Sequence, residues 1–326
     1  MRRTTDSGEG QGIAQSRFLR FSDKTFAMPE TDITAQAPAQ PRKKRIGVLV
    51  VAYNAEATLR SVLHRIPQPI VDKIDEIFVF DDASQDATTD VGKACQEELP
   101  QAKISVFKNP INLMYGGNQS KGYQYAMERE LDIVVLLHGD GQYAPEVMQD
   151  LLTPLENDEA DLVMGSRMMV PGAALRGNMP TYKYYGNKVL TWIENKLSGA
   201  KLSEFHSGYR AYSVEALRNI PLGRMTFNWH FDTQIILHFL RRGYRIKEVP
   251  IPTYYGDEIC HVNGIPYAMN CVLETTKYFL FDRWGVSARK RKQQQHRSSS
   301  HAALSRPPRS EEQPPADLQA RPGAAA

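Results

Sequence analysis

Cysteine is scarce in this chain of 326 residues, and the three that occur, Cys95, Cys260 and Cys271, lie far apart. None of them forms a C-x-x-C pair, which argues against a disulfide framework and against a structural zinc site. This cysteine usage is typical of a reducing compartment. The sequence therefore predicts a cytoplasmic protein.

Long apolar runs are also missing. The run 133–137 is among the longest, and it is far short of the roughly 20 residues that cross a bilayer. Arg2 and Arg3 are not followed by an apolar core, so no secretory signal is visible. We expect any membrane contact to be peripheral, at the inner face of the membrane.

The positive charge lies at the two ends of the chain. The formal net charge is +3, from 40 basic and 37 acidic residues. Residues 1–45 and 283–326 hold nine Lys or Arg each, against five and three Asp or Glu, so the middle is net negative. A nucleic-acid-binding domain would gather basic residues on its folded surface. We therefore expect no nucleic-acid partner.

Composition divides the chain into four parts. Residues 1–44 mix Ser, Thr, Gln, Gly and Pro without periodicity, and 285–326 are basic and of low complexity, so both are predicted to be disordered. Residues 45–255 form the predicted folded domain. Residues 256–284 are rich in aromatic side chains and follow it as a predicted helical segment.

Short apolar runs alternate with amphipathic stretches in the first half of that domain. The expected strands are 46–52, 77–80, 103–107 and 133–137, and the expected helices between them are 55–65, 87–98 and 117–130. This alternation predicts an α/β fold, in which a mostly parallel sheet carries helices on both faces. Ligands of such sheets bind beyond the carboxyl ends of the strands.

Carboxylates follow the second and fourth expected strands. Asp81 and Asp82 come directly after an apolar run, which favours ligand contact, although residues at this position also cap helices. Asp140 and Gln142 lie in a Gly-Asp-Gly-Gln turn, and their oxygens suit Mg²⁺ or Mn²⁺. An Asx-turn leading into the next helix explains Asp140 equally well. Gly117, in a Gly-Gly pair expected to precede a helix, offers a weaker phosphate site.

Two nucleotide-binding motifs are absent. Neither G-x-G-x-x-G nor G-x-x-x-x-G-K-[ST] occurs, which argues against a dinucleotide-dependent oxidoreductase and against a P-loop enzyme.

Five other motifs occur in a fixed order: V-A-Y-N-A-E from 51, D-D-A-S-Q-D from 81, G-D-G-Q-Y-A-P-E from 139, G-S-R from 165 and S-G-Y-R-A-Y from 207. In that order they resemble family-2 glycosyltransferases of the GT-A fold. The branch they resemble is that of dolichol-phosphate mannose synthase and bacterial polyprenyl-phosphate sugar transferases. The resemblance runs from about 46 to at least 252.

The resemblance implies a nucleotide-diphosphate-sugar donor, a divalent metal on the diphosphate and inversion at the anomeric carbon. It implies a role for each matching residue. The nucleotide pocket would contain Ala52, Tyr53 and Glu56, with Asp81 or Asp82 on the base. Asp140 and Gln142 would bind the metal, and Arg167 would face phosphate. Ser207, Gly208 and Arg210 would lie near the acceptor.

Some residues depart from the family pattern. His138 stands where the family commonly has the first aspartate of an Asp-x-Asp signature, so the metal site either lacks one carboxylate or uses imidazole. Lys183 and Lys188 lie where relatives often have a second arginine, and lysine lacks its bidentate fork. No Gln-x-x-Arg-Trp motif occurs, which favours transfer of a single sugar over processive synthesis.

The leading hypothesis is the transfer of one hexose from a UDP- or GDP-sugar to a polyprenyl phosphate, which is already anionic and needs no base. A glycan hydroxyl acceptor is the alternative and needs a catalytic base, for which Glu204 and Asp232 are the candidates. A nucleotide-sugar-binding protein without turnover is the third reading, suggested by His138.

The segment 254–284 bears on the acceptor. It is rich in aromatic residues and is followed by the basic cluster 289–292, as expected of a helix that lies on an anionic membrane. A C-terminal helix docked on the core, with a solvated basic tail, is the competing interpretation.

Overall fold

A computed structural model of the protein describes residues 42–255 and 263–285, with side chains up to residue 281. Its described strands form one sheet in the order β3-β2-β1-β4-β6-β5-β7. The strands are β1 (Ile46–Ala52), β2 (Glu76–Asp81), β3 (Ile104–Lys108), β4 (Ile133–His138), β5 (Leu162–Ser166), β6 (Arg210–Ser213) and β7 (Ile246–Pro250). The strand β6 runs antiparallel to both of its neighbours, and the other pairings are parallel. The predicted mostly parallel sheet is confirmed.

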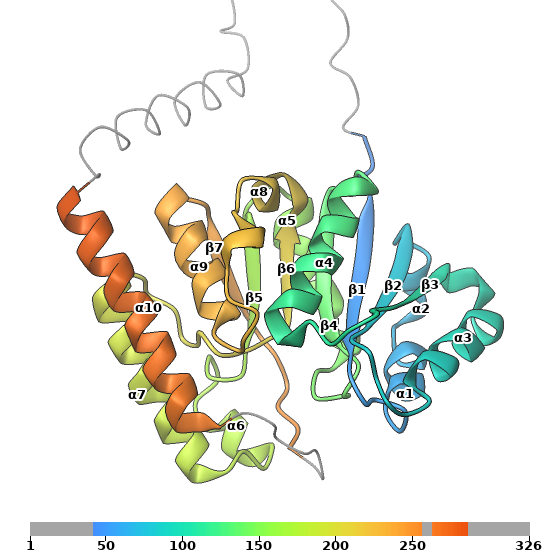
Figure 1. Ribbon diagram of the computed structural model, residues 1–326, viewed down its shortest axis with the longest axis horizontal. Helices are drawn as coiled ribbons and strands as arrows, with labels where there is room; N and C mark the ends of the chain where they lie inside the picture. The colour runs from blue at the N-terminus through green and yellow to red at the C-terminus, as the bar shows by residue number, and fades with distance from the viewer. Residues whose placement is uncertain (1–41, 256–262, 286–326) are drawn as a thin grey trace, which may run out of the picture. The chain divides into compact units, whose positions relative to one another are not determined.

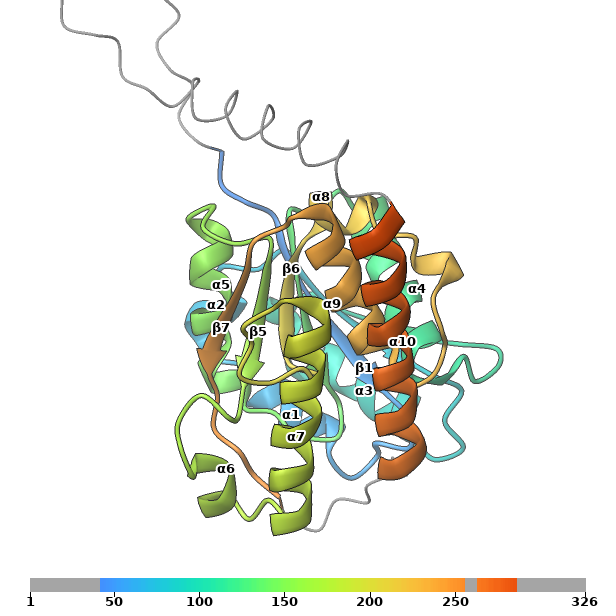
Figure 2. The same cartoon turned by 90° about the vertical axis from the view of Figure 1, so that its left-hand side faces the viewer.

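Helices cover both faces of this sheet (Figures 1 and 2). One face carries α1 (Leu59–His64), α2 (Gln68–Val71), α3 (Thr88–Glu98) and α5 (Met148–Glu156). The other carries α4 (Met114–Glu128), α8 (Val214–Arg218) and α9 (Phe231–Arg242). The strands β1, β2 and β4 are buried on both sides because each face meets a layer of helices.

The expected strands lie within one residue of those observed, but two helices begin elsewhere. The helix predicted from residue 55 begins at Leu59, because Ala55 to Thr58 form a turn. The helix predicted from Gly117 begins three residues earlier, at Met114. Gly117 therefore lies inside α4, where its N–H falls within the intrahelical hydrogen-bonding pattern, and Gly116 donates its N–H to the carbonyl of Phe227. The predicted phosphate contact of Gly117 does not fit this position.

Three helices form the remaining part of the described fold. The helix α7 (Thr181–Ser198) follows the short α6 (Ala173–Arg176), and the last described helix, α10 (Gly264–Gly285), packs against both α7 and α9 (Figure 1). The expected C-terminal helical segment is thus docked on the domain. None of the described helices combines the length and apolar character needed to cross a membrane. The predictions for 1–41, 256–262 and 286–326 lie outside the described residues.

Candidate active site

A cavity of about 800 Å³ opens between the end of β4 and the helices α7, α9 and α10. Several residues with a predicted role line it, among them Asp140, Gln142, Arg167 and Asp232. These four come from the loop after β4, the end of β5 and the start of α9. Because these elements are far apart in sequence, only the folded sheet and α9 bring the four side chains to one cavity.

The loop after β4 holds the predicted metal residues at the rim of the cavity. The Oδ1 atom of Asp140 accepts the N–H of Gln142 at 3.0 Å, so the Asx-turn foreseen as an alternative is present. That bond uses only part of the capacity of the carboxylate, and Asp140 is exposed. The residues thus leave oxygen atoms available, and the metal-binding prediction remains compatible with the Asx-turn.

His138, the last residue of β4, lines the cavity two residues before Asp140. It is buried, and its Nε2 atom has no hydrogen-bond partner among the described residues. Burial lowers the pKa of His138, although the charges of Asp140 and Asp232 oppose the shift. An imidazole that stays neutral and has an unpartnered nitrogen suits metal coordination. A Cβ atom at Gly208 would lie 2.7 Å from this nitrogen, which explains the glycine at that position.

Arg167 forms a buried ion pair with Glu204. Its Nε lies 3.0 Å from Glu204 Oε1, and its backbone N–H donates to Oε2 at 2.8 Å. Asn187 donates to the same carboxylate at 2.8 Å. Burial raises the pKa of Glu204, but the charge of Arg167 and these hydrogen bonds lower it more, so the net shift is downward. Glu204 has no exposed surface and does not line the cavity, which does not fit the predicted role of catalytic base.

Arg210 is also held inside the protein. It has no exposed surface and donates to the carbonyl oxygens of Phe205 and Ser207, each at 2.8 Å. It also lies 3.4 Å from Asp232 Oδ1. Ser207 is equally buried. The predicted acceptor contacts of Ser207 and Arg210 do not fit these positions, and the two residues instead brace the loop that carries Gly208.

Asp232 differs from Glu204 because it reaches the cavity. Its Oδ2 accepts the hydroxyl of Tyr115 at 2.7 Å, and both residues line the cavity. The ring of Tyr115 packs against Trp229, with the centroids 4.6 Å apart. Asp232 is therefore the one predicted base candidate that faces the site.

The predicted nucleotide pocket lies at the ends of β1 and β2. Tyr53 is 45% exposed and Glu56 is exposed, so both are accessible to a ligand, whereas Ala52 is buried. The two loops are joined by hydrogen bonds, since Asn54 N–H donates to Ser84 Oγ at 2.8 Å and Ala87 N–H donates to Glu56 at 3.1 Å. The roles of Ala52, Tyr53 and Glu56 remain predictions.

Asp81 and Asp82 are both buried. Asp81 accepts the N–H of Ser84 at 2.9 Å and the hydroxyl of Thr89, so it holds the turn before α3. This position fits a structural role in the turn rather than the favoured ligand contact. Asp82 accepts from Asn109 and from Leu113 N–H, both at 2.8 Å, and burial raises its pKa.

Sequence reasoning missed His206 and Tyr267. Both line the cavity, and His206 lies next to the Ser-Gly-Tyr-Arg motif, which was the available signal. Nothing in the local sequence connects it to Tyr267, because α10 is distant along the chain. Their contact depends on the docking of α10.

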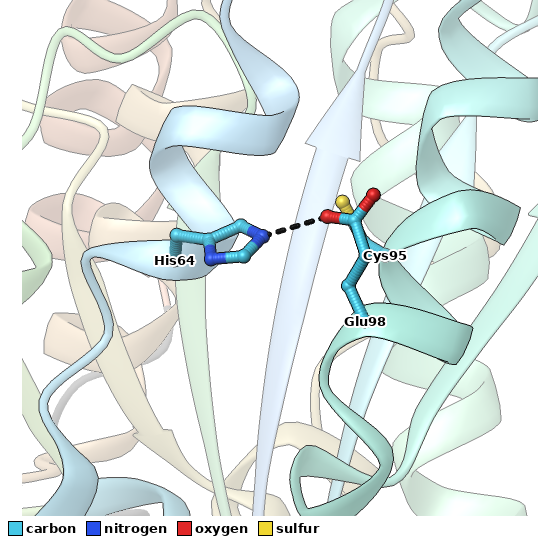
Figure 3. A group of neighbouring side chains, drawn as sticks. All are labelled: His64, Cys95 and Glu98. Atoms are coloured by element: carbon cyan, nitrogen blue, oxygen red, sulfur yellow. Dashed lines mark hydrogen bonds and ion pairs between the residues drawn. The ribbon is translucent and has the colours of Figure 1, made fainter.

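A second group of potential ligand atoms lies away from the cavity, between α1 and α3 (Figure 3). His64 Nε2 is 2.9 Å from Glu98 Oε2, and the sulfur of Cys95 lies nearby. Arg60 also pairs with Glu98, and burial raises the pKa of the Cys95 thiol. Glu98 of α3 thus has two partners on α1, Arg60 and His64, and these contacts join the two helices. They explain the group without a bound metal ion.

Comparison with known proteins agrees with this geometry. The sequence model of "Glycosyl transferase family 2" matches residues 47–220. The chain is 30% identical to an undecaprenyl-phosphate mannosyltransferase of Micrococcus luteus, over 75% of this chain and 98% of the relative. It is also 30% identical to a UDP-N-acetylglucosamine–dolichyl-phosphate N-acetylglucosaminyltransferase of Methanococcus voltae, over 66% of this chain and 87% of the relative.

Solved structures share the fold. One is glucosyl-3-phosphoglycerate synthase of Mycobacterium tuberculosis in complex with Mn²⁺, UDP and glucosyl-3-phosphoglycerate, with a TM-score of 0.53 and 20% identity. The alignment covers 74% of this chain and 82% of that one. The architecture is thus GT-A. With its ordered motifs and the family match over more than half of its length, the chain belongs to glycosyl transferase family 2 and is a glycosyltransferase.

Proposed function

We propose that the protein transfers a single hexose from a UDP- or GDP-sugar to a polyprenyl phosphate, with inversion and with the help of Mg²⁺ or Mn²⁺. The observation that carries the acceptor class is an exposed apolar surface beside the cavity. The names of the two relatives, which act on undecaprenyl and dolichyl phosphate, support it.

That apolar surface follows one face of each of two neighbouring helices. On α7 the exposed apolar side chains recur every three or four residues, and on α10 they recur mostly every four. They are Tyr182, Tyr185, Val189 and Trp192 on α7, and Ile265, Met269, Leu273 and Leu280 on α10. Tyr182 and Ile265, which are 72% and 75% exposed, also line the cavity. The surface is therefore continuous with the site, as a lipid chain requires.

The proposed donor side uses the residues at the cavity rim. Asp140 and Gln142 would hold the metal, and His138 lies two residues before Asp140 at the end of β4, with an Nε2 atom that has no hydrogen-bond partner among the described residues. The metal would neutralise charge that develops on the leaving diphosphate. Arg167 adds a fixed cation whose guanidinium is oriented by Glu204, Tyr255 and the carbonyl of His206. The Mn²⁺ and UDP of the solved relative support this assignment.

The state of the carboxylates favours a phosphate acceptor over a hydroxyl acceptor. A hydroxyl must lose its proton to a base, whereas a phosphate oxygen is already anionic. Glu204 is saturated by Arg167 and Asn187. Asp232 retains access to the cavity and keeps the hydroxyl acceptor as the second candidate function.

Turnover is tested by incubating the full chain with UDP- and GDP-sugars, Mg²⁺ or Mn²⁺ and a polyprenyl phosphate, with the lipid product detected by mass spectrometry. Asp140→Asn should lower turnover roughly 100-fold or more, because it removes the charged metal ligand. Asp150→Asn, an exposed aspartate of α5, is the matched control and should keep full activity. Transfer only to sugar hydroxyls would reject the proposed acceptor.

Membrane contact is tested by flotation with vesicles that contain anionic lipid. Replacing Trp192 and Met269 together with Ser should reduce vesicle binding severalfold, because the exposed apolar surface provides the insertion energy. The free energy of unfolding should change by no more than about 1 kcal/mol, since both side chains are mostly exposed. Unchanged flotation of this double variant would rule out α7 and α10 as the docking surface.

A further inference from the structure

A chain of polar groups leads from the cavity wall to a buried carboxylate. The hydroxyl of Tyr267 lies 2.8 Å from His206 Nδ1, and His206 Nε2 lies 2.9 Å from Glu194 Oε2. Glu194 has no exposed surface. Its Oε2 and the Nε2 of His206 are within ion-pair distance but without hydrogen-bond geometry, and neither atom has a hydrogen-bond partner in the described part of the chain. Tyr267 and His206 line the cavity, whereas Glu194 lies behind them.

The contact with Glu194 indicates which state of His206 the protein stabilises. An ionised carboxylate only accepts, so a carboxylate 2.9 Å away favours a proton on His206 Nε2. A neutral His206 then accepts the Tyr267 hydroxyl at Nδ1. Burial raises the pKa of Tyr267 far above its usual value of 10.0, so the phenol keeps its proton. When His206 becomes an imidazolium, Nδ1 donates to the phenol oxygen, and the Tyr267 proton is released to point elsewhere.

The charge of this chain matters to an anion in the cavity. With a neutral His206, the Glu194 carboxylate leaves a buried negative charge behind the wall, which repels a phosphate. Proton uptake by His206 cancels that charge and at the same time frees the Tyr267 hydroxyl as a donor. An incoming anion therefore favours the protonated state, and the protonated state favours the anion, as linkage requires.

We propose that Tyr267 is a hydrogen-bond donor to the phosphate of the acceptor and that His206, held by Glu194, takes up a proton when this phosphate binds. The inference rests on the proposed function, because Tyr267 would bind the phosphate group of the same polyprenyl phosphate acceptor. His206 lines the cavity, and Glu194 is a positioning residue that acts through His206.

The groups that face His206 come from several elements. Glu194 approaches from α7, and Tyr267 and Cys271 approach from α10. Arg167 donates to the carbonyl of His206 at 3.0 Å. Behind them, the hydroxyl of Thr233 lies 3.2 Å from Glu194 Oε1 and 3.3 Å from the sulfur of Cys271. Burial raises the pKa of Cys271 to about 12, so this thiol remains neutral and adds no charge to the cluster.

Proton uptake is measured by titrating a short-chain prenyl phosphate into the full chain by calorimetry, in two buffers of different ionisation enthalpy, above pH 7. The parent protein should take up a fraction of a proton, at most about one, beyond any uptake by the phosphate itself. His206→Gln should lose that extra uptake. Tyr267→Phe should weaken binding roughly tenfold to 100-fold, as expected for loss of a hydrogen bond to a charged group.

Two further variants separate this role from a structural one. Glu194→Gln should reduce the proton uptake while leaving the donor-sugar affinity unchanged. Cys271→Ser lies in the same cluster but outside the proton path, and it should match the parent in uptake and affinity. Equal uptake and affinity in the parent and His206→Gln, or equal impairment by Cys271→Ser, would overturn the inference.

The transfer assay keeps this result distinct from the proposed function. If the parent transfers sugar to polyprenyl phosphate and His206→Gln binds it equally well, the function stands and the inference is wrong. If the parent binds prenyl phosphate with histidine-dependent proton uptake but transfers no sugar to it, the inference stands and the proposed function is wrong. Absence of prenyl phosphate binding by the parent would reject both.

Discussion

The two sides of β4 are held together by different interactions. At the ends of β1 and β2, the loops are joined mainly by single hydrogen bonds between accessible residues, such as Glu56 with the N–H of Ala87. On the side of β6 and α7, the loop 203–210 is held by buried ion pairs, such as that of Arg167 with Glu204. The first arrangement leaves side chains such as Glu56 accessible to solvent. The second fixes its side chains in one geometry, so removing one partner should lower the free energy of unfolding substantially.

Removal of a carboxylate from each side tests this contrast with the largest expected effect. Glu204→Gln should lower the free energy of unfolding by about 3–5 kcal/mol, because it leaves the buried guanidinium of Arg167 without a counter-charge. Glu56→Gln is the control and should cost less than about 1 kcal/mol. Urea denaturation measures both values. Equal losses in the two variants would contradict the difference between the two sides.

A smaller effect is expected from filling the space beside His138. Gly208→Ala places a Cβ atom 2.7 Å from the His138 ring and 3.0 Å from the Tyr115 hydroxyl. The strain should cost about 1–3 kcal/mol and should lower turnover by displacing both groups. Gly223→Ala is the matched control, because nothing lies within 4 Å of its new Cβ. Full activity of Gly208→Ala would show that the loop 203–210 can accommodate the added Cβ atom without displacing His138 and Tyr115.

The smallest effect appears only in acid. The pKa of Glu204 is lowered from 4.5, so the unfolded chain binds the proton more readily than the folded protein does. The contribution of this carboxylate to stability is therefore present above pH 4.5 and lost as the pH falls through the lower folded value. Unfolding curves on both sides of pH 4.5 should show a steeper acid loss in the parent than in Glu204→Gln. Parallel curves would mean that the ion pair does not set the acid sensitivity.

The first half of the sheet could be predicted closely because its signals are local. The run 133–137 is apolar throughout, and the segments on either side of it are helical, so the strand and its place along the chain can be predicted from short stretches of sequence. The start of α4 was misplaced because Gly116 and Gly117 disfavour helix, whereas packing against Phe227 and Phe231 requires glycine there. Tertiary contact overrode the local preference.

By itself, the sequence determined the α/β class, the succession of strands and helices along the first half of the domain, the ordered motifs and the family. The tertiary structure alone decided which of the charged motif residues are free to act. Glu204 and Arg210 look as available as Asp140 in the sequence, but the fold gives them buried partners and leaves Asp140 exposed. It also placed Tyr267 of α10 beside His206 and Glu194. The reason is that the chemical role of a charged side chain depends on its partners and its solvent exposure. Both are set by segments that only folding brings together.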